Sequence, residues 1–389
     1  MIVCALILAA CSKKASTAGS TAGKYAGKTI QLGADLSLTG TGSIYGPQQK
    51  NGIELAESEI NAQGIDGAKL NITIVDDGSD QNQGAQQFQT LIQQTMVDGI
   101  IGPTLSNTAV GAHPVAQNLK TPVIAPSNTG NGIVGTCPYG PCDYIFRDSL
   151  GEATAVPANV TVAIGKYHPA TIALAYANDD KFSSDGAAIF KTTFTADNLN
   201  LVDTESFPKA TTDFSSFVTK MLAKKPDMVA ISAVGGVPAA YIVELRRQGY
   251  TGPIVGGNGF NSSAVSQQAG AGGNGAQSGS AWFLGVTTTV NTNFVNAYKA
   301  KYNQNPDQFA AQAYTAVYLF AAALKSANLT FTNLAADRTA IRNALEKVSI
   351  DTPLGPFSFT STHDVHQPIY VVSMNGAGGF NLVQTVQPS

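Results

Sequence analysis

The sequence predicts an α/β protein with two lobes, each built on a doubly wound parallel sheet. Short β-branched and apolar runs alternate along the chain with stretches that carry apolar residues at helical spacing, the order found in parallel sheets with helices on both faces. The chain has 389 residues, more than one hydrophobic core usually covers. Because the alternation starts again near residue 150, we expect the second lobe there.

The first lobe is expected to open with a strand followed by a helix. Pro47 suits the first turn of that helix, where its missing N–H is not needed. Ile53, Ala56 and Ile60 then fall on one face. In this part of the chain we predict strands at 29–35, 70–76, 99–102 and 122–126, and helices at 47–62, 83–96 and 108–118.

The second lobe is expected to repeat this order. We predict helices at 153–166, 184–197, 214–223 and 238–248, and strands at 171–177, 201–206, 228–232 and 253–256. The Gly-rich stretch GAGGNGAQSG at 270–279 is expected to be a loop, because regular patterns resume directly after it. The remaining predicted elements are helices at 293–302, 309–327 and 334–348, and strands near Phe357 and at 370–373 and 380–383.

Composition and motifs exclude several classes of partner. The chain carries 26 acidic and 23 basic residues, a net charge of −3, which gives no electrostatic reason to expect nucleic acid or a membrane surface. The glycines of Gly40–Gly46 are spaced G-x-G-x-x-x-G, which is neither a dinucleotide fingerprint nor a P-loop. No cofactor is therefore expected.

The first residues resemble a bacterial lipoprotein signal. The apolar run 1–10 ends in Leu8-Ala9-Ala10 before Cys11, so we expect removal of 1–10 and lipidation of Cys11. The run is too short to span a bilayer. Residues 11–28 are rich in Ser, Thr, Ala, Gly and Lys, which predicts a flexible tether. Two alternatives stay open: a buried N-terminal strand, and a start further upstream, since no Lys or Arg precedes the run.

Cys137 and Cys142 are the only cysteines outside the signal segment. The intervening Pro-Tyr-Gly-Pro turns the chain back, so we predict a disulfide, as befits an exported protein. Half of a zinc site is the rival, but no second cysteine pair completes it. His363 and His366 also lack a third ligand at clear spacing. We therefore expect no metal site.

Hydroxyl residues follow two neighbouring buried strands, in Gly102–Ser106 and Pro126–Thr129. Hydroxyls and free N–H groups at a helix N-terminus are what a carboxylate needs, although plain helix caps are the alternative. Asp76-Asp77 and Asp179-Asp180 also end strands, where a ligand crevice or a helix cap explains them equally well. With no G-x-S-x-G, no H-E-x-x-H and no free cysteine, we do not expect an enzyme.

Longer stretches resemble one known family. GADLSLTGTGSIYGPQQKNGIELAESEINAQGIDGAKLNITIVDD, IIGPTLSNTAVGAHPVAQNLKTPVIAPSNT, FRDSLGEATA and FSSFVTKMLAKKPDMVAISAVGGVPAAYIVELRRQG are similar, in order and spacing, to the leucine/isoleucine/valine-binding proteins. These are extracytoplasmic receptors of branched-chain amino-acid ABC importers. The resemblance runs from Ile30 to Val383, nearly the whole chain after the signal.

The resemblance implies a ligand site. Ser106 matches the hydroxyl that holds the ligand carboxylate, and Asn128 and Thr129 match positions that bind through backbone and hydroxyl groups. Tyr45 and Phe182 match aromatic residues of the two lobes. The full expected set is Tyr45, Leu105, Ser106, Ser127, Asn128, Thr129, Glu152, Phe182, Asn258 and Phe309.

Two departures bear on the ligand. Asn258 stands where amino-acid binders of the family carry a Glu that pairs with the α-ammonium, and Gly236-Val237 replaces aromatic residues. A buried ammonium without a carboxylate partner is costly unless Glu152, near the family's acidic residue at the first crossover, substitutes for it. We therefore expect an amino-acid-like ligand, an amide or urea, or an aromatic or aliphatic carboxylate.

The family further implies two lobes joined by three crossovers, near 147–151, 279–283 and 353–356. The lobes would then comprise 29–149 with 283–354, and 150–282 with 355–389. We expect a monomeric, lipid-anchored, extracytoplasmic protein whose closed form docks on an ABC permease and never touches the ATPase. A ligand sensor that reports to a signalling receptor is the alternative, since one fold serves both.

Overall fold

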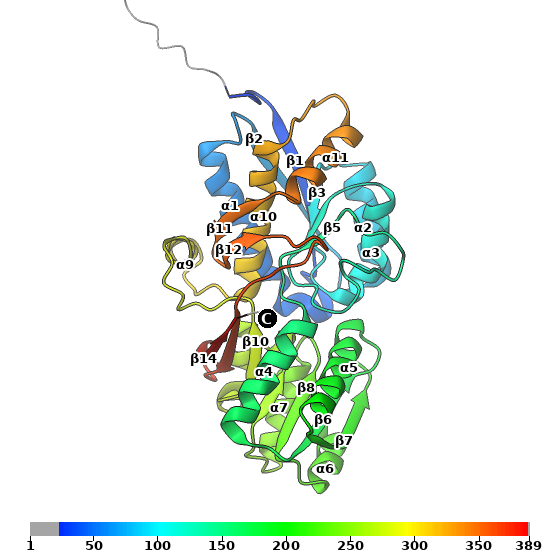
Figure 1. Cartoon of the computed structure of the whole chain (residues 1–389), viewed down its shortest axis with the longest axis vertical. Coiled ribbons are helices and arrows are strands. Elements are labelled where there is room, and N and C mark those ends of the chain that lie inside the picture. Colours follow the sequence, from blue (N-terminus) through cyan, green and yellow to red (C-terminus); the bar gives the residue numbers. More distant parts are fainter. Residues whose placement is uncertain (1–22, 388–389) are drawn as a thin grey trace, which may run out of the picture.

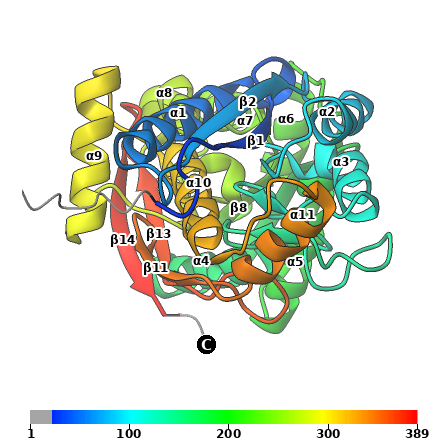
Figure 2. The same ribbon diagram turned by 90° about the horizontal axis from the view of Figure 1, so that it is seen from above.

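The computed structural model describes residues 23–387, which form two sheets one above the other (Figure 1). Five parallel strands build the first sheet, in the order β2 (Lys69–Asp76), β1 (Thr29–Leu36), β3 (Gly99–Ile101), β4 (Val123–Ala125) and β5 (Ile145–Arg147). One face packs on α1 (Gly46–Gln63), α10 (Gln308–Ser326) and α11 (Leu334–Leu345). The other packs on α2 (Gln81–Gln93) and α3 (Ser106–Asn118). Helix α9 (Thr289–Tyr302) lies at the edge of the molecule, against α1 (Figure 2).

Seven strands form the second sheet. Their order is β14 (Phe380–Val386), β13 (Ile369–Met374), β10 (Gln277–Ser280), β9 (Ile254–Gly256), β8 (Met228–Ser232), β6 (Thr171–Ala177) and β7 (Asn200–Phe207). One face packs on α4 (Glu152–Tyr167) and α5 (Lys181–Ala196), the other on α6 (Ser215–Ala223), α7 (Val237–Arg247) and α8 (Ser263–Ala269). The doubly wound fold is confirmed, with β13 and β14 added antiparallel at one edge.

Strand β10 corrects a prediction, because it occupies part of the stretch 270–279 that was expected to be a loop. Its residues are polar or Gly yet fully buried, so hydropathy gave no sign of it. Partners satisfy part of them: the Gln277 side-chain amide donates to Asn159 and the Ser278 hydroxyl donates to Asn261, while Oε1 of Gln277 has no partner among the described residues. Hydrogen bonding replaces apolar burial in this strand.

The hairpin β11 (Ser349–Thr352) and β12 (Gly355–Ser358) lies beside the first sheet. Phe357 and Phe359 are buried in the same core as strand β1, and the Arg147 guanidinium forms an ion pair with Asp364. We therefore propose that the third crossover lies between Asp364 and Ile369, further along than the expected 353–356. The rest of the expected division into lobes stays a prediction.

The chain is already part of the fold before residue 29. Cys11 and most of the expected tether at 11–28 lie outside the described residues, but Tyr25 is buried. Its ring meets Phe331 edge-on, and its hydroxyl donates to the carbonyl of Ala327. A single aromatic residue thus docks the last part of the stretch that composition alone marks as a tether.

Cys137 and Cys142 form the predicted disulfide in the loop between β4 and β5. Both cysteines are buried against α2 and α3. His363 is buried and stacks on Phe146, whereas His366 is exposed. Within residues 23–387, no three His, Cys, Asp or Glu side chains come together as a metal site would require. None of the helices in that range is long and apolar enough to cross a membrane.

We predict that the unreduced protein has no free thiol at Cys137 or Cys142, as mass spectrometry after alkylation will show. Replacing both cysteines with serine should lower the free energy of unfolding by about 2 kcal/mol, because the short loop is no longer closed in the unfolded chain. Urea unfolding of the two proteins measures this difference. Alkylation of both thiols together with tightly bound zinc would contradict the prediction.

Candidate ligand-binding site between the two sheets

A cavity lies between the two lobes, next to the carboxyl ends of strands from both sheets. This is where open α/β sheets bind ligands. The cavity holds about 310 Å³ of space between protein atoms, counting solvent at its mouth. Its lining comprises Tyr45, Thr104, Leu105, Ser106, Ser127, Asp180, Phe182, Val234, Asn258, Gly259 and Phe309. Seven of the ten residues in the predicted set are among them.

Apolar side chains from both lobes form one wall of the cavity. Tyr45, Leu105 and Phe309 come from the first lobe, and Phe182 and Val234 from the second, and the five pack as one buried cluster. The rings of Tyr45 and Phe309 have centroids 4.5 Å apart. Because the cluster is complete only when both lobes meet, an apolar part of a ligand held here contacts both lobes.

Ser106 is the first residue of α3 and presents a hydrogen-bond donor to the cavity. Its Oγ accepts from the backbone N–H of Gly130 at 3.2 Å, so the hydroxyl hydrogen is free to donate elsewhere. No side chain caps the N-terminus of α3. The positive end of the helix dipole and the unpaired N–H groups there favour an anion, and a carboxylate in particular.

Ser127 lines the cavity, but its hydroxyl is engaged inside the first lobe. It donates to the Thr104 carbonyl at 2.6 Å and accepts from Nε2 of Gln49 at 2.8 Å. The side chain of Asn128 also points into the first lobe and away from the cavity, since its Nδ2 donates to the Thr104 carbonyl at 3.1 Å. These side chains fix the loop after β4, while Asn128 itself does not line the cavity.

Glu152 lies behind the cavity wall, at the start of α4. It is fully buried, and its Oε1 accepts from the backbone N–H of Asn258 at 2.8 Å and from the Thr129 hydroxyl at 3.5 Å. Burial raises the pKa of Glu152 to about 7. Glu152 and Thr129 thus meet each other across the lobes, and the cavity lining includes neither.

Asp180 is a lining residue that the predicted set lacks. Its Oδ1 caps α5 by accepting from the backbone N–H of Ser183 at 2.9 Å, and burial raises the pKa of its carboxyl. It is the only Asp, Glu, Lys or Arg among the lining residues. Sequence analysis offered two roles for Asp179-Asp180, a helix cap and a position in a ligand crevice. Asp180 has both. Val234 and Gly259 carried no signal in the sequence, whereas Thr104 belongs to the hydroxyl-bearing stretch Gly102–Ser106 but was not in the predicted set.

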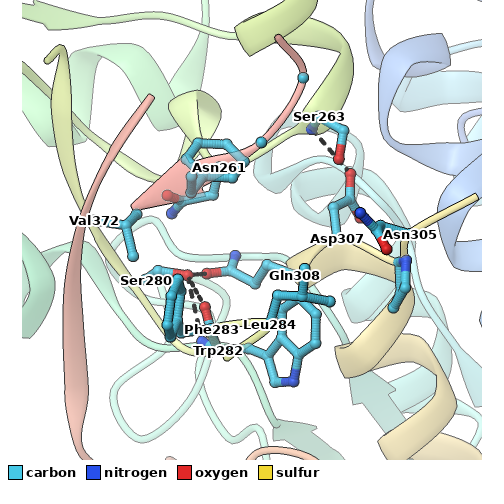
Figure 3. Close-up of a pocket in the computed structure, with 14 residues that line it drawn as sticks. Asn261, Ser263, Ser280, Trp282, Phe283, Leu284, Asn305, Asp307, Gln308 and Val372 are labelled. Carbon is cyan, nitrogen blue, oxygen red and sulfur yellow. Dashed lines mark hydrogen bonds between the residues drawn. The ribbon is translucent and has the colours of Figure 1, made fainter. Parts of the chain in front are cut away.

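Backbone and side-chain contacts hold the two lobes together around the cavity. The Tyr45 hydroxyl donates to the Gly259 carbonyl at 3.1 Å and accepts from the Gly235 N–H at 3.0 Å. Asp307 caps α10 and also accepts from the Ser263 N–H at 3.2 Å (Figure 3). Segments that belong to the two sheets are therefore in direct contact around the cavity.

Two curated proteins are similar over most of the chain. The Leu/Ile/Val-binding protein BraC3 of Rhizobium johnstonii is 26% identical, and the match covers 86% of this chain and 89% of that one. Leu/Ile/Val-binding protein homolog 7 of Brucella suis is 26% identical, with 71% and 72% covered.

Solved structures share the fold. The branched-chain amino acid transporter substrate-binding protein LivJ of Streptococcus pneumoniae, solved with isoleucine, has a TM-score of 0.82 at 26% identity, covering 93% of this chain and 99% of that one. An ABC-transporter solute-binding protein of R. palustris, solved with benzoate, has a TM-score of 0.82 at 23% identity, covering 92% and 97%. The sequence profile of the periplasmic binding protein family matches residues 29–379, and the chain therefore belongs to the periplasmic binding protein family.

Proposed function

We propose that this chain is the solute-binding protein of an ABC importer and that it holds a small ligand with a carboxylate in the cavity between its lobes. The observation that carries the proposal is the uncapped N-terminus of α3, with Ser106 at the cavity wall. That arrangement provides N–H and O–H donors for a carboxylate, and the apolar cluster, which includes Leu105 next to Ser106, takes the rest of the ligand. The amino-acid and benzoate complexes of the similar structures fit this class of ligand.

Ligand binding and closure are coupled in this proposal. The apolar wall draws residues from both lobes, so a ligand makes its full set of contacts only in the closed form and shifts the equilibrium toward it. The closed form then docks on a membrane permease. A lipid on Cys11 keeps the protein at the outer face of the membrane that carries the permease.

Replacing Ser106 with Ala is expected to weaken binding of a carboxylate ligand by about 10-fold or more, because a hydroxyl donor to a charged group is lost. A thermal-shift screen of amino acids, hydroxy acids, amides and benzoates identifies the ligand. Calorimetry then gives the Kd of both proteins.

Ser326→Ala is the matched control, since Ser326 ends α10 and its hydroxyl donates to the Ala323 carbonyl. It should bind as the unaltered protein does. An unchanged Kd in the Ser106 variant would remove Ser106 from the ligand site.

The exchange of Glu152 for Gln should stabilise the protein more at pH 8 than at pH 5. The pKa of Glu152 rises from 4.5 to about 7 on folding, so the folded state holds a proton that the unfolded state has released. This contribution to stability is full below about pH 4.5 and is lost as the pH rises through 7. We expect the gain from Glu152→Gln to grow by about 2 kcal/mol between the two pH values.

Urea unfolding at both pH values measures this gain. Glu54→Gln is the control, because the side chain of Glu54 is 39% exposed and solvent screens its charge. A gain for Glu152→Gln that is equal at pH 5 and pH 8 would contradict the expectation.

Lipidation is testable at Cys11. With a complete signal upstream, the unaltered protein should incorporate labelled palmitate and sediment with membranes, while Cys11→Ala should do neither, because only the acylated cysteine anchors the chain. Cys137→Ser with Cys142→Ser controls for labelling at other thiols. Labelled Cys11→Ala protein would refute the anchor.

A further inference from the structure

We propose that Asn258 offers the ligand a hydrogen-bond donor and no acceptor, so that the ligand carries an uncharged acceptor where amino acids carry an ammonium. The inference rests on the proposed function, since it concerns the polar group next to the carboxylate of the same ligand. It depends on which way three side-chain amides are turned. Backbone groups, whose roles as donor or acceptor are fixed, determine two of them, and these two determine the third.

Gln308 is oriented by the backbone of the crossover. The N–H of Ala281, which can only donate, lies 2.8 Å from Oε1 of Gln308. The Ser280 hydroxyl lies 2.6 Å from the same oxygen and shares its one hydrogen between that oxygen and the carbonyl of Trp282 (Figure 3). Oε1 is therefore held at this end of the side chain, and Nε2 must point the other way. Gln308 itself does not line the ligand cavity.

The amide of Gln308 in turn orients Asn258. Nε2 of Gln308 lies 2.6 Å from Oδ1 of Asn258, and as a donor it needs the oxygen there. Asn261 supplies a second donor at 3.2 Å, with its own Nδ2 fixed by the Gly279 carbonyl at 2.9 Å. Both acceptor positions of the Asn258 oxygen are thus occupied by the protein.

What remains of Asn258 is its Nδ2. The backbone N–H of Asn258 donates to Glu152, and its carbonyl accepts from the N–H of Asn261. Among the described residues, the side-chain hydrogen bonds of Asn258 all run to its Oδ1, and none runs from Nδ2. Because Asn258 is only 7% exposed and lines the cavity, these N–H groups are available to a ligand. An ammonium, which can only donate, would leave them unpaired.

Asp180 also lines the cavity and adds a second requirement. Its carboxylate accepts, while Asn258 donates. A hydroxyl or a carboxamide both accepts and donates, and so matches the pair, whereas an ammonium matches Asp180 alone. The ligand is therefore a small apolar carboxylic acid with a hydroxyl or carboxamide near the carboxylate. The same pair disfavours a second carboxylate, which Asp180 would repel.

Two probes test this directly, L-leucine and L-2-hydroxy-4-methylpentanoate, which differ only in ammonium against hydroxyl. By calorimetry, the unaltered protein should bind the hydroxy acid at least about 10-fold more tightly than leucine. One mismatched buried donor weakens binding by about that factor. If the screen finds an acid with another carbon skeleton, the same amine and hydroxyl pair is made on that skeleton.

Gln308→Met tests the origin of the preference without touching the cavity or its charge. Asn258 is then free to turn its oxygen to the ligand, and the preference for the hydroxy acid should fall to less than about 3-fold. Gln312→Met is the matched control, a buried Gln one turn further along α10 and outside this set of bonds, and it should keep the preference. Gln308→Glu, which retains the bond from Ala281, replaces the Met variant if that one does not fold.

The outcomes separate the two proposals. Leucine binding as tightly as the hydroxy acid, or a preference unchanged in the Gln308 variants, overturns the assignment of Asn258 while carboxylate binding stands. If no acid in the screen raises the melting temperature, the proposed function fails and the inference fails with it.

Discussion

The closed cleft must satisfy its own polar groups, because its walls are shielded from water and an unpaired donor or acceptor there is costly. The Tyr45 hydroxyl uses both of its hydrogen-bonding roles on the backbone of the opposite lobe. Gln308, Asn258 and Asn261 share donors and acceptors in the same way. The polar groups that remain available at the cavity, such as the Ser106 hydroxyl and Nδ2 of Asn258, are the ones that we propose for the ligand.

Periodicity predicted most of the fold, because most elements bury an apolar face. Helix α1 and strand β6 lie within a residue or two of their expected bounds. Strand β10 escaped detection because its buried groups are polar, and hydrogen bonds to Asn159, Asn261 and Gln308 take the place of apolar packing. Tyr25 escaped for the opposite reason, as one aromatic residue in a polar stretch gives no periodic signal. The position of the third crossover could not be predicted either, because no pattern in the sequence shows how far the chain stays beside the first sheet after the hairpin.

The candidate site was predictable to the level of strand ends and of family resemblance. Those arguments brought Ser106 and Phe182 to the cavity wall, since their positions follow from topology. They also selected Asn128 and Glu152, which the structure places beside the lining and not in it. Whether a side chain at a strand end points into a crevice or back into its own lobe depends on partners far away in the sequence. The orientation of the Asn258 amide is the clearest case, since Gln308 lies 50 residues further along the chain.

Helix α10 joins the cleft to the beginning of the folded chain. Its first turn is capped by Asp307, which also reaches the second lobe, and its last turn is followed by Ala327, on which Tyr25 docks. With 19 residues, the helix is about 28 Å long. The lipid anchor that we propose upstream of Tyr25 would therefore pull on the first lobe, at the end of α10 that is away from the cavity. In that proposal the second lobe would bear no load from the anchor, and anchoring would not hinder its opening.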